Sequence, residues 1–429
     1  MRRSKHSLSH YNLLTCDMGK LVPCGLFEVL PGDTVQQATS FLIRVTPMLA
    51  PVMHPVHVRV HHWFVPHRII WEDFEDFITG GQDGLDASVF PTITFASGVA
   101  KSTLGDYLGV PIGVNNIEVS ALPFRAYSKI YNEFYRDADL ASEQVIDETS
   151  GPDTTTNTTI KNVMWEKDYL TSSRPWAQKG AVVSLPLGTS APVTTPKSGS
   201  SSDVAIGYDA AVQSGQLYTT AGPTDYVIAD LSSATAATVN DLRLSLALQR
   251  YQEARARYGS RFSEYLRYLG VRSSDARLQR PEYLGGGRQT IQFSEVLQTA
   301  EGTNPVATLR GHGITGMRSR RYRRFFEEHG YVMSLLSVKP KTMYFEGLER
   351  HWNRRTKTDF WQKELQHIGQ QEVLNKEVYA AHATPEGTFG YQDRYDEYRR
   401  VQSNVAGDYQ DTVANFWHMA RDFVRSGVE

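Results

Sequence analysis

Apolar and polar residues alternate most clearly over positions 55–65, as in a strand with one buried face. One side of this extended segment carries Val56, Val58, Val60, His62 and Phe64, and the other carries His57, Arg59, His61 and Trp63. Runs rich in β-branched and aromatic residues predict further strands at 21–30, 39–48, 289–297, 330–338 and 341–345. Their wide separation predicts an antiparallel sandwich with long insertions.

The segment 122–137 has the three- and four-residue spacing of an amphipathic helix. Its apolar face would carry Phe124, Tyr127, Ile130, Tyr131, Phe134 and Tyr135, and its rim Arg125, Lys129, Glu133 and Asp137. We expect Arg125, Lys129 and Arg136 to be structural or interface cations. Similar spacing predicts helices at 71–78, 239–258 and 412–424, with Asn240 or Asp241 as the N-cap of the second. The apolar face of that second helix would carry Leu244, Leu248, Tyr251, Ala254 and Tyr258.

The segment from about 188 to 238 differs from the rest of the chain in composition, because Thr, Ser, Ala and Gly dominate it. Lys197 is the only basic residue between Gly180 and Asn240. Such a composition buries little apolar surface by itself, so we expect an exposed insertion that neighbours help to order.

Charge and composition narrow the class of protein. The 429 residues include 45 Lys and Arg against 47 Asp and Glu, so the whole chain is not a polycation. No apolar run approaches the roughly 18 residues that span a membrane, and no signal-peptide core follows the basic N-terminal residues, so we expect a soluble product without membrane insertion. Cys16 and Cys24 are too few for a disulfide framework, which fits folding in a reducing cytoplasm.

Several motifs invite a catalytic or ligand-binding interpretation that their context does not support. Residues 311–316 match the G-x-G-x-x-G dinucleotide fingerprint, but an arginine-rich run rather than an apolar helix follows them. Residues 285–288 lack the Lys of a phosphate loop and predict a flexible turn. The five histidines between His54 and His67 lie in an extended segment that separates His57 from His61 by about 13 Å, too far to share one metal ion, so a surface or interface role is favoured. We expect no enzyme, no cofactor and no metal site.

One basic feature remains, a predicted loop over 302–326 that contains no acidic residue. Its candidate phosphate-binding residues are Arg310, Arg318, Arg320, Arg321, Arg323 and Arg324, with Tyr322 and Phe325 as candidate stacking residues. Arg2, Arg3 and Lys5 form a second basic segment. The alternative is a solvated loop, or a patch that pairs with acids such as Glu327 and Glu328 between subunits.

The sequence of residues 122–137, LPFRAYSKIYNEFYRD, resembles a signature of the major capsid proteins of the Microviridae, in particular the gokushovirus-like single-stranded DNA phages. Further similar stretches are EVLPGDT at 28–34, TPMLAPVM at 46–53, FVPHRIIW at 64–71, DYLTSSRPW at 168–176, DARLQRPEYLGGG at 275–287 and FGYQDRYDEYR at 389–399. The resemblance implies an eight-stranded antiparallel viral jelly roll with long loop and helical insertions. The chain 1–429 would be a single capsid subunit, with its core at about 20–187 and 239–429, and 188–238 would be a surface insertion near a threefold axis.

The resemblance also implies a function in assembly. Roughly sixty copies would form a T=1 icosahedral virion capsid around circular single-stranded DNA, assembled in the cytoplasm of a host bacterium. The implied partners are a small basic DNA-packaging protein, a scaffolding protein and a host receptor contacted by the insertion. Five tryptophans outside the core strands favour extensive subunit interfaces: Trp165, Trp176, Trp352, Trp361 and Trp417. Two alternatives remain, a monomeric jelly-roll protein that binds or hydrolyses carbohydrate and a free single-stranded DNA-binding protein.

Overall fold

A computed structural model describes residues 4–183, 239–302 and 305–423, together with the backbone of four short strands in the predicted insertion. These strands are β7 (Val193–Thr194), β8 (Ile206–Tyr208), β9 (Leu217–Thr219) and β10 (Ile228–Ala229), and they pair as β7 with β10 and β8 with β9. The rest of the 188–238 insertion lies outside the described residues. The chain divides into two compact units, Met1–Ala177 with Arg257–Glu429, and Gln178–Ala256.

The larger unit contains a four-stranded antiparallel sheet, here called the first sheet. Its strand order is β1 (Leu21–Val29), β15 (Gly330–Pro340), β4 (Val56–Pro66) and β11 (Glu282–Thr290). The predicted alternation of β4 is confirmed, since Val56, Val58 and Val60 are fully buried while His57 and Arg59 are only partly buried. The strands predicted at 21–30, 55–65 and 330–338 therefore form the centre of the fold.

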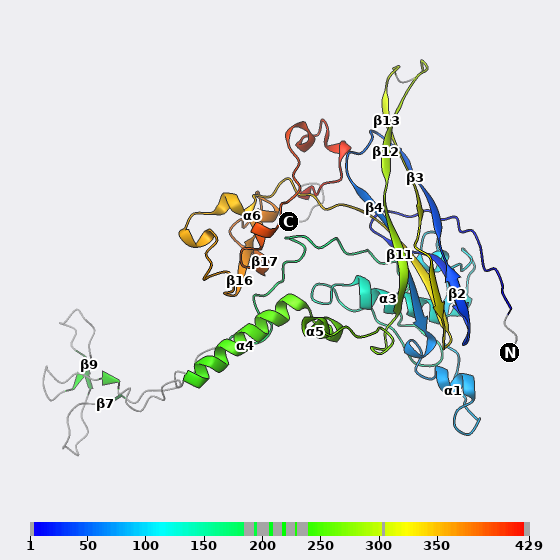
Figure 1. The fold of residues 1–429 in the computed structure, drawn as a ribbon, viewed down its shortest axis with the longest axis horizontal. Coiled ribbons are helices and arrows are strands. Elements are labelled where there is room, and N and C mark those ends of the chain that lie inside the picture. The colour runs from blue at the N-terminus through cyan, green and yellow to red at the C-terminus, as the bar shows by residue number, and fades with distance from the viewer. Residues whose placement is uncertain are drawn as a thin grey trace. The chain divides into compact units, whose positions relative to one another are not determined.

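A second sheet packs against the first. It contains β12 (Gln292–Leu297), β13 (Leu309–Arg318) and β3 (Ser40–Met48) in that order, and β14 (Tyr322–Phe325) pairs with β2 (Thr34–Gln37). Figure 1 shows β3, β11, β12 and β13 running alongside one another. Val58 and Leu336 of the first sheet share a core with Met317 and Phe293 of the second, so the two sheets form a sandwich.

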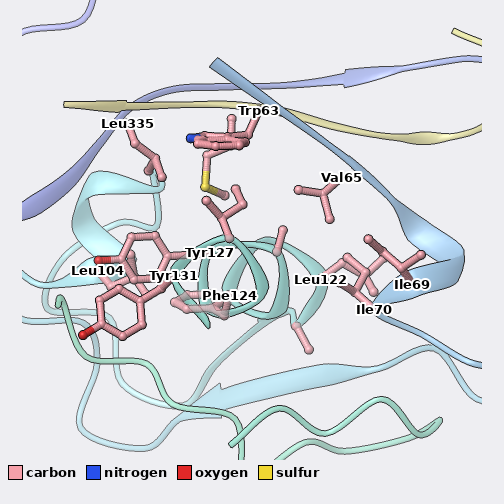
Figure 2. Close-up of a cluster of buried hydrophobic side chains, with 14 of the residues drawn as sticks. Trp63, Val65, Ile69, Ile70, Leu104, Leu122, Phe124, Tyr127, Tyr131 and Leu335 are labelled. Atoms are coloured by element: carbon pink, nitrogen blue, oxygen red, sulfur yellow. The ribbon is translucent and has the colours of Figure 1, made fainter. Parts of the chain in front are cut away.

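Helix α3 (Leu122–Ile130) and the π-helical turn Tyr131–Tyr135 cover the other face of the first sheet. In Figure 2, Trp63 and Leu335 extend from their strands toward this helix, where Tyr127 and Phe124 complete the cluster. The helix is buried on more sides than its amphipathic pattern predicts. Arg125, expected on a charged rim, is fully buried, because Asp153 and two backbone carbonyls accept all of its observed hydrogen bonds.

The remaining described elements are five helices, two strand pairs and several 3-10 turns. The helices are α1 (Phe74–Thr79), α2 (Leu104–Tyr107), α4 (Val239–Tyr258), α5 (Phe262–Tyr268) and α6 (Asn375–Val378). The remaining strands are the antiparallel pairs β5 (Thr92–Phe95) with β6 (Ile117–Ser120), and β16 (Gln370–Leu374) with β17 (Thr388–Asp393). Single 3-10 turns occupy His67–Ile69, Arg350–Asn353, Lys357–Asp359, Asp396–Arg399, Gly407–Gln410 and Asn415–Trp417. The described protein is thus mainly β, with antiparallel sheets and few helices.

Several local predictions were wrong. No strand forms over 341–345, where only an isolated bridge joins Tyr344 to Arg421, and the run 289–297 is divided at Ile291 between β11 and β12. The segment 412–424, predicted as a helix, contains one 3-10 turn within its described part. Its apolar residues pack against different clusters, Met419 against the core between the sheets and Phe423 against the cluster that contains Val373, so no single helical face forms. Helix α4 begins at Val239, so Asn240 and Asp241 lie inside its first turn.

Candidate nucleic-acid interface

The arginine-rich segment is built from strands, which corrects the predicted loop over 302–326. Strand β13 pairs on both sides, with β12 and with β3, and β14 pairs with β2. The many arginines misled the sequence prediction, because cross-strand pairing decided the conformation. Strand geometry sends successive side chains to opposite faces, so the arginines separate into two sets.

The face of β13 that points away from the sandwich carries Arg310 and Arg318, both exposed. The opposite face carries Thr315 and Met317, which are buried between the sheets. Residues directly opposite in an antiparallel pair share a face. Arg44 of β3 is exposed and its neighbour across the pair is Ile314, which lies on the same side as Arg318. Sequence reasoning missed Arg44, although the apolar residues Phe41, Ile43 and Val45 signal that it faces outward.

Strand β14 extends this face. Arg323 is exposed and lies on the opposite side from Tyr322, whose hydroxyl donates to Gln37 Oε1 at 2.6 Å. Arg324, on the same side as Tyr322, forms an ion pair with Glu282 of β11. Gln36 lies opposite Arg323, and in the amide orientation that satisfies both groups its oxygen accepts from Arg321 Nε at 2.8 Å and Nη2 at 2.9 Å. Arg321 and Arg323 therefore gather beside β2.

A buried hydroxyl fixes the corner between β13 and β14. Ser319 Oγ accepts the Thr39 N–H at 2.9 Å and lies 3.2 Å from His62 Nε2, while His62 Nδ1 lies 2.7 Å from Ser334 Oγ. Burial lowers the pKa of His62 to about 4, so the ring is neutral at pH 7. Because Ser319 points inward, its neighbours Arg318 and Arg320 are both exposed. The corner thus directs two guanidinium groups toward solvent.

The outward face is cationic and carries no acid from its own strands. Glu295 is the one carboxylate in β2, β3, β12, β13 and β14, and it lies opposite Gly311, on the inward side of β13. Within the ranges that the structure describes, no carboxylate lies within 4.0 Å of the guanidinium groups of Arg44, Arg310, Arg318, Arg320 and Arg323. Arginines on a face without competing carboxylates can bind phosphate oxygens through bidentate hydrogen bonds.

The candidate stacking residues are placed differently from each other. The Tyr322 ring is half-buried, with its centroid 5.7 Å from that of His62, and burial raises its pKa. Phe325 is exposed and on the same side of β14 as Arg323, whereas the adjacent Phe326 is buried against Phe64. Lys5 is exposed in the N-terminal segment, and Arg2 and Arg3 lie outside the described residues.

The motifs set aside in the sequence are structural. Residues 311–316 lie within β13, so no helix presents its N-terminus to a nucleotide. The predicted turn at 285–288 is wrong, because these residues belong to β11, where a Cβ at Gly286 would lie 2.2 Å from the Val60 carbonyl oxygen. The predicted surface role of the histidines fails for His54, His62 and His67, which are buried, although His61 and His62 do face opposite sides.

The described ranges contain neither a candidate metal site nor a membrane-spanning helix. No group of three or more His, Cys, Asp or Glu side chains there has the arrangement of a metal site. The helices of the same ranges include none with both the length and the apolar composition needed to cross a membrane.

Comparison with known proteins decides the family. The profile of the family described as "Capsid protein (F protein)" matches residues 1–426 of the chain. The chain belongs to this capsid protein family. "Capsid protein VP1" of Bdellovibrio phage phiMH2K is 36% identical over 98% of this chain and 85% of its own length. The VP1 capsid proteins of Chlamydia phage 1 and Spiroplasma virus 4 are each 30% identical over 99% of this chain, and 87% and 86% of their own lengths are covered.

These matches confirm the resemblance to Microviridae capsid proteins and the structural role that it implies. As a capsid protein the chain functions in an oligomeric shell as a component of the virion. Neither alternative class, a monomeric carbohydrate-active protein or a free single-stranded DNA-binding protein, is retained. The capsid protein also exposes large aromatic side chains that a shell can bury, such as Trp352 at 62% and Trp361 at 50%.

Proposed function

We propose that this capsid protein encloses a circular single-stranded DNA genome and contacts it through the outward face of β13, β14 and β3. The observation that carries the proposal is the group of exposed arginines on a face without carboxylates from its own strands, above all Arg44, Arg318 and Arg323. Single-stranded DNA is held by phosphate contacts whose strength falls with salt. Exposed Phe325 beside Arg323 supplies an aromatic surface on which a base can stack.

A jelly-roll arrangement accounts for the connections between the two sheets. The chain passes from β1 of the first sheet to β3 of the second and back to β4, and later from β11 through β12 and β13 back to β15. The late strand β15 then lies between β1 and β4. This alternation supports the eight-stranded jelly roll, whose walls would form a closed T=1 shell of roughly sixty copies.

The charge of the chain supports a further partner. The formal net charge is −2 at pH 7, so a shell of these subunits cannot neutralise an enclosed genome with its protein charge alone. A small basic DNA-packaging protein would supply the missing positive charge, with a scaffolding protein acting during assembly in the bacterial cytoplasm. The insertion at 188–238, rich in Thr and Ser, would project from the shell and contact the host receptor.

The test of the DNA interface compares two double variants. Replacing Arg318 and Arg323 by Gln should leave shell assembly intact and lower the DNA content per shell. The dependence of single-stranded DNA binding on salt should also weaken: the slope of log K against log salt concentration should fall in magnitude by about 0.7 for each lost phosphate contact. The matched control replaces Arg272 and Arg277 by Gln; both are exposed and lie in the segment before β11, outside β3, β13 and β14, so this variant should retain normal DNA content. Equal DNA content in both double variants would reject the interface.

A further inference from the structure

The opposite side of the sandwich carries a second concentration of positive charge. A cavity of about 360 Å³ opens on the face of the first sheet that α3 covers only in part. Strands β4 and β15 contribute Arg59, His61 and Lys339 to its lining, and the segment after the π-helical turn contributes Arg136. The DNA-contacting arginines of β13 and β14 belong to the other sheet, so this cavity is separate from that interface.

Strand register forces like charges together beside the cavity. Arg59 of β4 lies directly opposite Arg288 of β11, an arrangement that destabilises a sheet unless an anion compensates it. One carboxylate compensates both arginines. Glu166 forms an ion pair with Arg59, and its Oε1 lies 3.6 Å from Arg288 Nη2. A single negative charge is thus shared between two guanidinium groups.

Lys339 adds a third cation that is more deeply buried. It is 8% exposed, and its Nζ donates to the Met164 carbonyl at 2.9 Å. No carboxylate of the described part of the chain forms an ion pair with it. An ammonium group has three N–H donors, so this neutral acceptor leaves donor capacity unused. Burial, followed by the nearby charge of Arg59, lowers the pKa of Lys339 to about 8.

The other acids of the cavity are already engaged. Asp137 pairs with Lys167 and with Arg174, at 2.9 Å for the latter, and Asp139 lies 3.2 Å from the same Arg174 guanidinium. These two carboxylates therefore cannot offset Lys339 or Arg59. In addition, the buried Arg59 Nε has no hydrogen-bond partner in the described structure. Four carboxylates of the described residues line the cavity in all: besides Asp137 and Asp139, Glu264 pairs with Arg261, and Glu166 is shared between Arg59 and Arg288. Within the same part of the chain, Lys339 is therefore left without an ion pair, and Arg59 Nε without an acceptor.

We propose that this cavity binds a phosphate group, as inorganic phosphate or as the phosphate of a nucleotide. A tetrahedral anion presents several oxygens, which can accept hydrogen bonds from Lys339 and from Arg59 while its charge relieves the repulsion between Arg59 and Arg288. The volume lies at the lower end of the range for small-molecule sites, which suits a single phosphate or a mononucleotide.

The test measures inorganic phosphate binding to the full-length, unassembled subunit by calorimetry and by thermal melting at constant ionic strength, with chloride as reference. Phosphate should raise the melting temperature of the wild-type protein. Lys339→Met should weaken phosphate binding at least tenfold. Lys341→Met, an exposed lysine two residues later, should bind as wild type does. Arg288→Gln, at a side chain 48% exposed, provides a second variant in case the buried change impairs folding.

The result separates the two sources of phosphate and the two interfaces. Tighter binding of a mononucleotide than of inorganic phosphate, lost in Lys339→Met, would identify a nucleotide site, and equal binding a phosphate site. The Arg318 and Arg323 double variant should bind phosphate normally, because its arginines lie on the other sheet. Absence of phosphate binding, or equal binding by the Lys339 and Lys341 variants, would overturn the proposal, as would binding only of an acidic peptide.

Discussion

Arg125 Nε lies 2.9 Å from Asp153 Oδ2, and neither side chain is exposed to solvent. The other guanidinium nitrogens donate to the carbonyl oxygens of Ile70 and Thr149, and Asp153 also accepts from Thr155 and Thr156. The pair therefore joins α3 to the loops that cover it. A charge buried this completely is tolerated because every observed contact is a hydrogen bond to a charged or strongly polar group.

Removing one partner should leave the other charge uncompensated. We expect Arg125→Met to lower the free energy of unfolding by about 3 to 5 kcal/mol, measured by urea denaturation of the unassembled subunit. The control is Lys129→Met on the same helix, whose ion pair with Glu148 at 2.6 Å is partly exposed. That change should cost about 1 kcal/mol or less. Similar losses in both variants would contradict a special role of the buried pair.

The buried His62 should make stability depend on pH. Burial lowers its pKa from 6.5 to about 4, so the folded protein binds fewer protons than the unfolded chain between these values. The contribution of the neutral His62 to stability is therefore fully present above about pH 6.5 and is lost as the pH falls toward 4. The loss in the free energy of unfolding for the full shift is about 3 kcal/mol. Unfolding of the unassembled subunit at pH 7.5 and 4.5 measures this loss.

His62→Gln keeps a polar side chain but removes the titrating group, so its loss of stability between pH 7.5 and 4.5 should be smaller than in the wild type. Carboxylates and His61, whose pKa is also about 4, titrate in both proteins, so the difference isolates His62. An unchanged pH dependence in the variant would show that His62 does not contribute.

The glycines of β11 and β13 should differ sharply in tolerance to alanine. A Cβ at Gly286 would lie 2.2 Å from the Val60 carbonyl oxygen, whereas the nearest atom to a Cβ at Gly316 is the Phe41 oxygen at 3.9 Å. Gly286→Ala should lower the free energy of unfolding by about 1 to 3 kcal/mol, because the backbone of β4 must move. Urea denaturation would show this loss as a lower midpoint. Gly316→Ala should remain close to wild type, and equal losses would refute the steric argument.

Exposed tryptophans should matter for the shell and little for the subunit. Trp361 is 50% exposed, so Trp361→Ala should change the free energy of unfolding by about 0.5 kcal/mol or less. Buried at an interface between capsid proteins, the same side chain is expected to contribute about 2 kcal/mol or more per contact. Particle yield by ultracentrifugation should fall in Trp361→Ala and recover in Trp361→Phe. Normal yield in the alanine variant would place Trp361 outside the interfaces.

Local patterns predicted the strands that are buried on a regular repeat. Alternation along 55–65 identified β4, and the apolar run at 330–338 identified β15, because both strands have continuous contact with the core. The same approach failed over 302–326, where arginines and glycines have weak strand preference and pairing with β3 and β12 determines the conformation. It also failed at 412–424, where Met419 and Phe423 pack against two different clusters, so tertiary contacts rather than helical periodicity determine the conformation.

The sequence by itself determined the family, because its characteristic motifs are spread along the whole chain. It also showed that arginines are concentrated in one segment. Only the tertiary structure decided how those arginines are arranged. Arg44 and Arg318 are far apart in sequence and share a face because β3 pairs with β13. Arg125 is buried, and not on the predicted exposed rim, because loops cover that side of α3. Sequence periodicity reports which side of one element is apolar. Register between distant strands is set by packing and hydrogen bonding across the whole sandwich, and no local pattern contains it.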